Sequence, residues 1–347
     1  MSTTPNPPRP DKGDPDRPIP TPPFPRPGQR DGKDGGDGPH YSSWLVIRYQ
    51  AGDTGGRPLP PGTVFWESPD VWTQGSQGTN QPVVGEATQV FTRITNLGMQ
   101  DATGITVKYW WANPSIAISE ATATLIATDT VTVPAGNSLV FQSPVDWVPV
   151  NQNNGHECLL VEAYDPLFDP LTDPMHPRND RHVGQKNEHV ITLQAGQNFK
   201  FEMDAANFTA AQQNVFVEAR RGLIPRNFAR RFGTPTMWPA ELLDPMLAAP
   251  VALNIAAEPV RTVPAGQKSA LATTVAAAPI DCLPPPDAAA TQRFRPGEVR
   301  RVTIAGELPA AAAPGEIYVI RISQRIGQVI VGGYTLYLTA AANIRRG

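Results

Sequence analysis

The chain has 347 residues, which is enough for about two domains of roughly 100–200 residues each. Its formal net charge of -3 gives no global attraction to nucleic acid or to an anionic membrane surface, and we expect neither as a partner. No run of about 18 apolar residues occurs, so we expect no membrane span. The 39 prolines disfavour long helices and central strands, and the composition therefore predicts short strands and many loops.

Residues 1–40 are rich in proline and glycine and contain few large apolar side chains. Such a segment cannot bury enough apolar surface to offset its ordering entropy, so we expect a disordered tail. It acts either as a spacer or, through the proline-rich stretch Pro22–Pro27, as a docking peptide. It lacks the apolar core of a secretory signal, which makes cytoplasmic residence the default and leaves signal-independent export or surface assembly open.

A pattern of strand, turn and strand occurs twice. In both copies a glycine stands the same interval before the asparagine of the turn, Gly85 before Asn96 and Gly196 before Asn207. Because internal repetition defines the architectural unit, the pattern predicts two domains of one design. The short strands and frequent turn residues indicate that this design is an antiparallel β-sandwich.

Later landmarks follow in the same order in both halves. The Gly136–Gly155 and Gly297–Gly315 intervals differ by a single residue. We therefore predict an all-β chain of two tandem immunoglobulin-like antiparallel β-sandwiches, at residues 41–185 and 186–347. The second carries a long inserted loop at about 220–290, which has no counterpart in the first.

Two tryptophans of the first domain are candidate contact residues. Alternation along one strand places a set of residues on its core face: Ile105, Val107, Tyr109 and Trp111. Trp110 lies on the opposite face, so we expect it to point outward unless a neighbouring loop covers it. Exposed tryptophans stack on sugar rings or anchor partners, so Trp110 and Trp72 support a polysaccharide-binding alternative.

The segment 165–182 is the strongest candidate for ion chemistry because Asp-Pro pairs recur in it every four residues. A hard cation such as calcium would find oxygen ligands at Asp165, Asp169 and Asp173, with His176 beside them. This would be the centre of a metal-dependent enzyme. The alternative is a turn-rich linker in which each aspartate caps its own turn. We find no other catalytic constellation and expect no other cofactor.

The inserted loop opens with arginines and has no acidic residue before Glu241. The arginines are Arg220, Arg221, Arg226, Arg230 and Arg231. Such a cluster would grip a partner rich in carboxylate or phosphate. The alternative is a solvated basic loop that pairs with the protein's own acids.

One stretch of the first domain resembles a known family. Residues 92–98 read Thr-Arg-Ile-Thr-Asn-Leu-Gly, and Ala102, Val107 and Tyr109 follow. This is similar to the pattern of CARDB-type domains, bacterial immunoglobulin-like modules with a suspected link to cell adhesion. The resemblance covers about 60–190 and is weaker in the second copy, where Thr209 replaces the turn glycine. It implies a non-enzymatic structural or adhesive module, and we expect a protein partner within a larger bacterial surface or secretion-related assembly.

Overall fold

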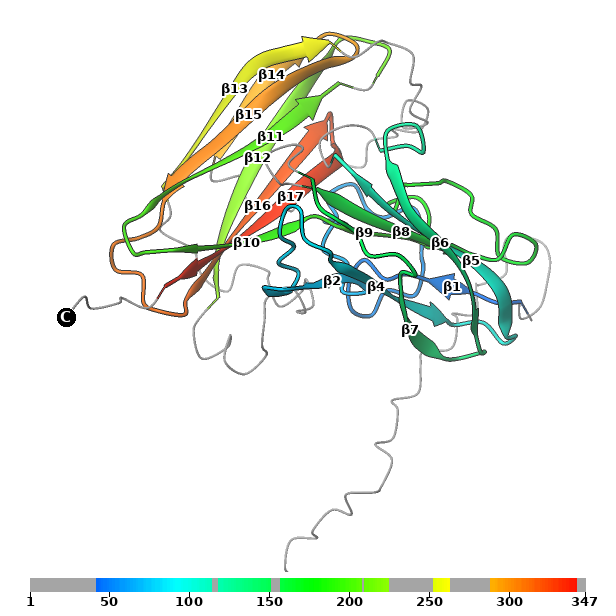
Figure 1. The fold of residues 1–347 in the computed structure, drawn as a ribbon. Coiled ribbons are helices and arrows are strands. Elements are labelled where there is room, and N and C mark those ends of the chain that lie inside the picture. The colour runs from blue at the N-terminus through cyan, green and yellow to red at the C-terminus, as the bar shows by residue number, and fades with distance from the viewer. Residues whose placement is uncertain are drawn as a thin grey trace, which may run out of the picture. The chain divides into compact units, whose positions relative to one another are not determined.

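The computed structural model describes residues 42–113, 118–150, 157–207, 209–224, 252–262 and 288–341. Contacts along the chain separate Met1–Gly38 from a second unit, Pro39–Gly347, which is the one described here. The described residues form strands and no helix, which confirms the all-β fold class (Figure 1). No described segment is a helix with the length and apolar character needed to cross a membrane. The tail expected at 1–40 lies outside the described residues.

The first sandwich contains two sheets. One consists of β1 (Leu45–Val46), β2 (Val71–Gly75), β3 (Gly78–Thr79), β4 (Gln89–Asn96) and β7 (Ser138–Gln142). The facing sheet has the order β6-β5-β8-β9, from β5 (Ala102–Ala112), β6 (Thr124–Val133), β8 (Cys158–Tyr164) and β9 (Val183–Lys186). Within the first sheet, β4 is central. Thr92 pairs with Val71 of β2 and also with Phe141 of β7, so these two strands lie on opposite sides of β4.

The core of this sandwich lies between its two sheets. Val90 and Ile94 of β4 belong to the same buried cluster as Ile105, Val107 and Tyr109 of β5. The period of two in β5 thus confirms the predicted core face, and Trp111 packs against the same cluster while partly buried.

The second sandwich also has two sheets. The larger has the order β10-β17-β16-β12-β14, from β10 (Glu188–Leu193), β12 (Gln213–Ile224), β14 (Ala288–Phe294), β16 (Ile317–Ile326) and β17 (Val329–Ala340). The smaller has the order β11-β15-β13, from β11 (Asn198–Ala206), β13 (Ala252–Thr262) and β15 (Glu298–Glu307). The β10–β17 pair is parallel, whereas the other pairs are antiparallel. Phe201, Ile304 and Leu336 come from both sheets and share one buried cluster.

One sheet of each sandwich has the same strand order, and this shared order is how the sequence repeat appears in the structure. The order β6-β5-β8-β9 in the first corresponds to β14-β12-β16-β17 in the second. The chain passes from the first sandwich to the second at Asn187, between the end of β9 and the start of β10. The exact domain bounds stay a prediction.

Within the span expected as a long loop at about 220–290, the described residues are strands: β12 continues to Ile224, β13 occupies Ala252–Thr262 and β14 begins at Ala288. The rest of the span lies outside the described residues, so the extent of the insertion stays a prediction. β13 was not predicted from the sequence because the strand is rich in alanine and contains Pro259, and both residue types have low strand propensity. An edge strand tolerates proline, and the ladder between β13 and β15 shifts register between Pro259 and Arg261.

Trp66 and Glu67 of the first sandwich contact β16 and β17. The Glu67 carboxylate accepts hydrogen bonds from Arg321 Nε at 2.8 Å and Nη2 at 2.9 Å. Trp66 Nε1 donates to Thr335 Oγ1 at 3.1 Å. The Trp66 ring passes so close to Gly333 that a Cβ there would lie 2.2 Å from the indole. Glu67, Trp66 and Thr335 are buried, so these polar groups are satisfied by one another.

Candidate functional site

The most exposed large apolar side chains among the described residues lie on a turn at Asp165–Asp169. Asp165 and Asp169 exchange backbone hydrogen bonds of 3.1 and 3.2 Å, which closes the turn. Asp165 Oδ1 also accepts the N–H groups of Leu167 at 2.9 Å and Phe168 at 3.1 Å. The Leu167 residue is 82% exposed and Phe168 is 69% exposed. The backbone of this Leu167–Phe168 turn is therefore fixed while its side chains remain accessible to solvent.

The base of the turn is anchored to the first sheet. Asp169 Oδ2 accepts the N–H of Leu45 in β1 at 2.7 Å. Asp169 Oδ1 is paired with Arg181 and lies 3.2 Å from His182 Nε2. The Arg181 guanidinium stacks over the Trp44 ring at 3.6 Å from its centroid. Asp169 is buried, so its charge is balanced inside the protein and holds the turn in place.

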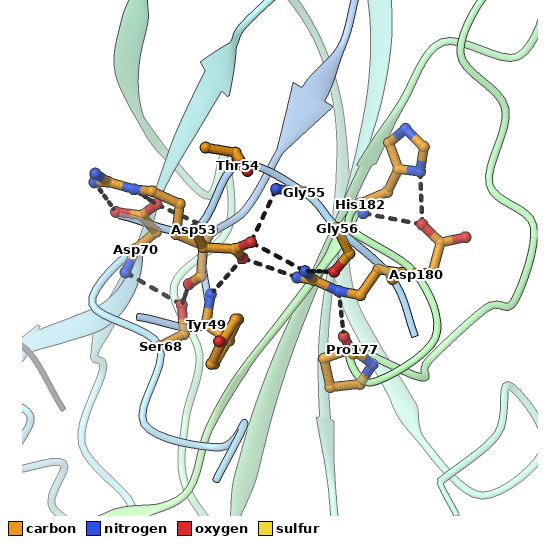
Figure 2. Close-up of polar contacts among 12 residues, drawn as sticks. Tyr49, Asp53, Thr54, Gly55, Gly56, Ser68, Asp70, Pro177, Asp180 and His182 are labelled. Carbon is orange, nitrogen blue, oxygen red and sulfur yellow. Dashed lines mark hydrogen bonds and ion pairs between the residues drawn. The ribbon is translucent and has the colours of Figure 1, made fainter. Parts of the chain in front are cut away.

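Asp180 organises the remainder of the segment. Its Oδ2 accepts the N–H groups of Thr172 at 2.6 Å and Asp173 at 2.9 Å. Its Oδ1 accepts from His182 Nδ1 at 2.6 Å (Figure 2). Burial by itself raises the pKa of Asp180, but these donors outweigh burial and hold it well below the usual range. Burial lowers the pKa of His182, and the Asp169 and Asp180 carboxylates outweigh that effect and raise it.

A second polar network joins this segment to residues 49–57. Arg57 donates through Nη1 and Nη2 to the two carboxylate oxygens of Asp53, at 3.1 and 3.0 Å. Its Nε donates to the carbonyl of Pro177 at 2.9 Å, and Asp53 also accepts the N–H of Gly55 at 2.9 Å (Figure 2). The loop at 165–182, which carries the Leu167–Phe168 turn, is therefore held by hydrogen bonds at Pro177 as well as at Asp169 and Asp180.

The structure brings Asp173 and His176 into contact but does not gather the four predicted cation ligands into one site. Asp165 caps its own turn, Asp169 binds Leu45 and Arg181, and Asp173 accepts from His176 Nδ1 and Asn179 Nδ2, both at 2.6 Å. Among the described residues, which include all four candidates, no group of three or more histidine, cysteine or acidic side chains is arranged to hold a metal. The geometry fits the alternative, in which each aspartate stabilises its own turn or loop.

Trp110 is buried, with only 7% of its surface exposed, which matches the alternative that a neighbouring loop covers it. The loop that follows β8 covers it, and Met175 of that loop lies in the same buried cluster. The Trp110 Nε1 donates to Glu162 Oε2 at 3.1 Å, and Glu162 Oε1 accepts the N–H of Met175 at 2.9 Å. Burial raises the pKa of Glu162 despite these donors. Trp110 therefore packs against the part of this loop that contains Leu171 and Met175.

Trp72 lies on β2 and is half-buried. Its ring stacks on Phe91 with centroids 5.5 Å apart and planes 7° apart, and the Arg93 guanidinium lies 5.6 Å from the ring centroid. With Trp110 buried, the polysaccharide-binding alternative rests on Trp72 alone and stays a prediction.

The predicted arginine cluster is divided by the structure. Arg220 and Arg221 lie within β12, where they pair with Arg321 and Ile320 of β16, and not in a loop as expected. Consecutive strand residues point to opposite faces, so these two do not form one patch. Arg226, Arg230 and Arg231 lie outside the described residues.

Sequence reasoning missed Leu167 and Phe168. The available signal was an apolar pair enclosed by two Asp-Pro dipeptides, which marks a turn whose tip has no core to enter. Attention to the carboxylates as ligands concealed the apolar residues between them.

No family model and no curated protein matches the chain. Among solved structures it is similar to a family 123 glycoside hydrolase from Clostridium perfringens, at 10% identity and a TM-score of 0.26, over 45% of this chain and 23% of that one. It is similar to a transglutaminase from red sea bream, at 10% identity and a TM-score of 0.20, over 79% of this chain and 31% of that one. A tip adhesin, CupB6 of Pseudomonas aeruginosa, matches at 10% identity and a TM-score of 0.21, over 87% of this chain and 99% of that one.

The chain therefore spans 23% and 31% of the length of the hydrolase and the transglutaminase. At these TM-scores the likenesses carry no argument about family or activity, and the CARDB-like resemblance stays a prediction.

Proposed function

We propose that the chain is a non-enzymatic structural or adhesive binding module, and that it contacts a protein partner through the Leu167–Phe168 turn. One observation carries the proposal: two large apolar side chains, 82% and 69% exposed, stand on a turn whose backbone is closed by hydrogen bonds. Monomeric proteins commonly expose single apolar residues, whereas a few large side chains that enter a pocket of the partner carry most of the binding energy at an interface.

The rigidity of the turn favours binding. Asp165 and Asp169 already hold the backbone, so a partner need not order it on contact. Burying a leucine or phenylalanine side chain contributes about 1.5–3 kcal/mol each. Because neither side chain can donate or accept a hydrogen bond, they fit an apolar protein pocket better than a hydroxyl-rich sugar.

The polar chemistry of the segment supports a structural role. Asp165, Asp169 and Asp180 accept hydrogen bonds from backbone groups that they position. Carboxylates engaged in this way stabilise a loop and are not placed to act on a substrate. The CARDB-like pattern of residues 92–98 adds the finer proposal of a larger bacterial surface or secretion-related assembly.

A photo-crosslinking residue at position 168, compared with the same residue at Met99, tests the proposal. Met99 is 64% exposed and belongs to another loop, so it is a matched control. In cells of the native source we expect a defined crosslinked protein from position 168 that is absent from position 99. Excess unlabelled protein should compete for it, and the L167D/F168D variant should not. Equal crosslinking at the two positions, or none at 168, would contradict the proposal.

A further inference from the structure

In the second sandwich a strand covers a sheet edge that, among the described residues, no strand covers in the first. β7 in the first sandwich and β15 in the second occupy the same place. The N–H of Asn96 donates to Asn137 O just before β7 at 2.9 Å, and the N–H of Asn207 donates to Glu298 O at the start of β15 at 3.0 Å. β13 then pairs antiparallel with the outer edge of β15, from Glu298 to Glu307. Among the described residues, β7 pairs with β4 alone (Figure 1).

On the outer edge of β7, the backbone groups pair with no strand among the described residues. Asn137 O accepts from β4, and the N–H of Ser143 donates to Val90 O at 2.8 Å. In an antiparallel pair, residues alternate between facing the neighbouring strand and facing away. By this alternation Ser138, Val140 and Gln142 direct their N–H and C=O groups to the open edge.

β7 and the residues that follow it carry exposed apolar side chains. Leu139 is 38% exposed and Val140 49% exposed, and three further exposed valines follow within ten residues: Val145, Val148 and Val150. Phe141 is half-buried, whereas Val302, its counterpart in β15, lies between β11 and β13 in its sheet and is fully buried. A covering strand would therefore bury apolar area that β7 now exposes.

We propose that this edge pairs with β7 of a second copy of the chain, antiparallel and centred on Val140. The strand Ser138–Gln142 is polar at both ends and apolar in the middle, so its order of polar and apolar residues is the same in both chain directions. Around a twofold axis at Val140, Ser138 faces the second copy's Gln142, and Leu139 faces the second copy's Phe141. The strand carries no charge, so two copies do not repel each other there.

The length of the contact is also defined. Pro144 has no N–H and cannot extend the ladder, so the pairing ends after Gln142. A five-residue ladder gives a weak dimer in which the register is set by the Val140 pair. The inference does not depend on the proposed partner of the Leu167–Phe168 turn, because it concerns another surface and is tested with other variants.

Charge exchange at the twofold centre tests the proposal with the full chain. In V140K and in V140E the two copies would place like charges opposite each other, and we expect association to weaken by about tenfold or more. An equimolar mixture of the two variants should associate again, because opposite charges then meet. The matched control is L125K, which changes an exposed leucine on the edge strand β6.

Sedimentation velocity from about 10 µM to about 1 mM would measure the association, with circular dichroism to verify that each variant is folded. Concentration-dependent dimers of the wild type and L125K, weaker association of each Val140 variant, and recovery in the mixture would support the proposal. A monomeric wild type over the whole range would overturn it. So would variants that associate like the wild type, or a mixture that stays as weak as its components, which would assign the edge to a different occupant.

Discussion

The side chain of Asn96 in the first sandwich and that of Asn207 in the second share three equivalent hydrogen bonds. Each Oδ1 accepts the N–H two residues ahead, that of Gly98 or Thr209, at 3.0 Å. Each Nδ2 donates at 2.8 Å to the carbonyl four residues ahead, that of Gln100 or Ala211. Each Nδ2 also donates to a backbone carbonyl in the other sheet of its sandwich, Val133 O at 3.1 Å or Phe294 O at 3.3 Å. Both residues are fully buried, so the repeat preserves one hydrogen-bonded turn.

Replacing either turn asparagine should destabilise its sandwich. In N96A and in N207A, buried carbonyl and N–H groups lose their partners, and we expect a loss of about 1–3 kcal/mol in the free energy of unfolding. Urea denaturation measures this. N137A is the matched control because Asn137 is exposed, and it should change stability by about 0.5 kcal/mol or less. Equal effects at positions 96 and 137 would show that burial of the amide is not decisive.

Adding one methyl group at Gly333 should disturb the contact with Trp66. The new Cβ would lie 2.2 Å from the indole and 2.6 Å from the Ile322 carbonyl, so either the ring or the strand must move. We expect G333A to lower the free energy of unfolding by about 1–3 kcal/mol. The control is G56A, because a Cβ at Gly56 meets nothing within 4 Å. Thermal unfolding of the two variants in parallel decides between them, and a G333A protein as stable as G56A would refute the close approach.

Glu157 should make stability depend on pH in the neutral range. Burial raises its pKa to about 7 from about 4.5, although the Val150 N–H lowers it in part. The folded state thus prefers the protonated acid. This contribution is complete below about pH 4.5 and is lost as the pH rises to about 7. We expect E157Q to be more stable than the wild type at pH 8 by about 1–3 kcal/mol, and to be similar to it at pH 4.

Urea midpoints at several pH values measure the difference, with E86Q as the control at an exposed carboxylate. Parallel pH profiles for the wild type and E157Q would contradict the buried-acid account.

His182 should also make stability depend on pH, but the form that the folded state favours is charged, whereas the favoured form of Glu157 is neutral. Its pKa is raised because Asp169 and Asp180 outweigh burial, so the folded state prefers the protonated imidazolium. The stabilisation is complete below the ordinary histidine pKa of about 6.5 and is lost as the pH rises through the raised value. We expect the wild type to lose stability over that window and H182Q to lack this loss. Melting temperatures from pH 6 to pH 9 measure it. An unchanged slope in H182Q would assign the dependence to another group.

Much of the fold could be predicted from local patterns. The repeat of Asn96 and Asn207, and the alternation through Ile105, Val107 and Tyr109, correctly predicted turns, a strand and its core face. These features depend on neighbours within a few residues, so periodicity and turn chemistry reveal them. β13 escaped prediction because its alanines and Pro259 have low strand propensity, and its pairing with β15 depends on residues more than 30 positions away.

The candidate site was less accessible to sequence reasoning. Alternation correctly separated Trp110 from the core face of β5, but a loop that returns from beyond β8 covers its other side. The aspartates at 165, 169 and 173 have the composition of a cation site, yet their oxygens accept from backbone and side-chain groups at different places. Leu45 and Arg181 contact Asp169, and Asn179 contacts Asp173. Only the tertiary fold decides which of these groups lies beside which carboxylate.

The sequence by itself determined the all-β class, the repeated turn and the alternation of core residues, because each follows from local backbone preference and a short hydrophobic period. Only the tertiary structure decided which side chains remain exposed. Burial depends on the loop or strand that finally lies against a residue, and that segment is often distant in the chain. This is why Trp110 is covered, why Leu167 and Phe168 are not, and why β15 has a covering strand where β7 has none among the described residues.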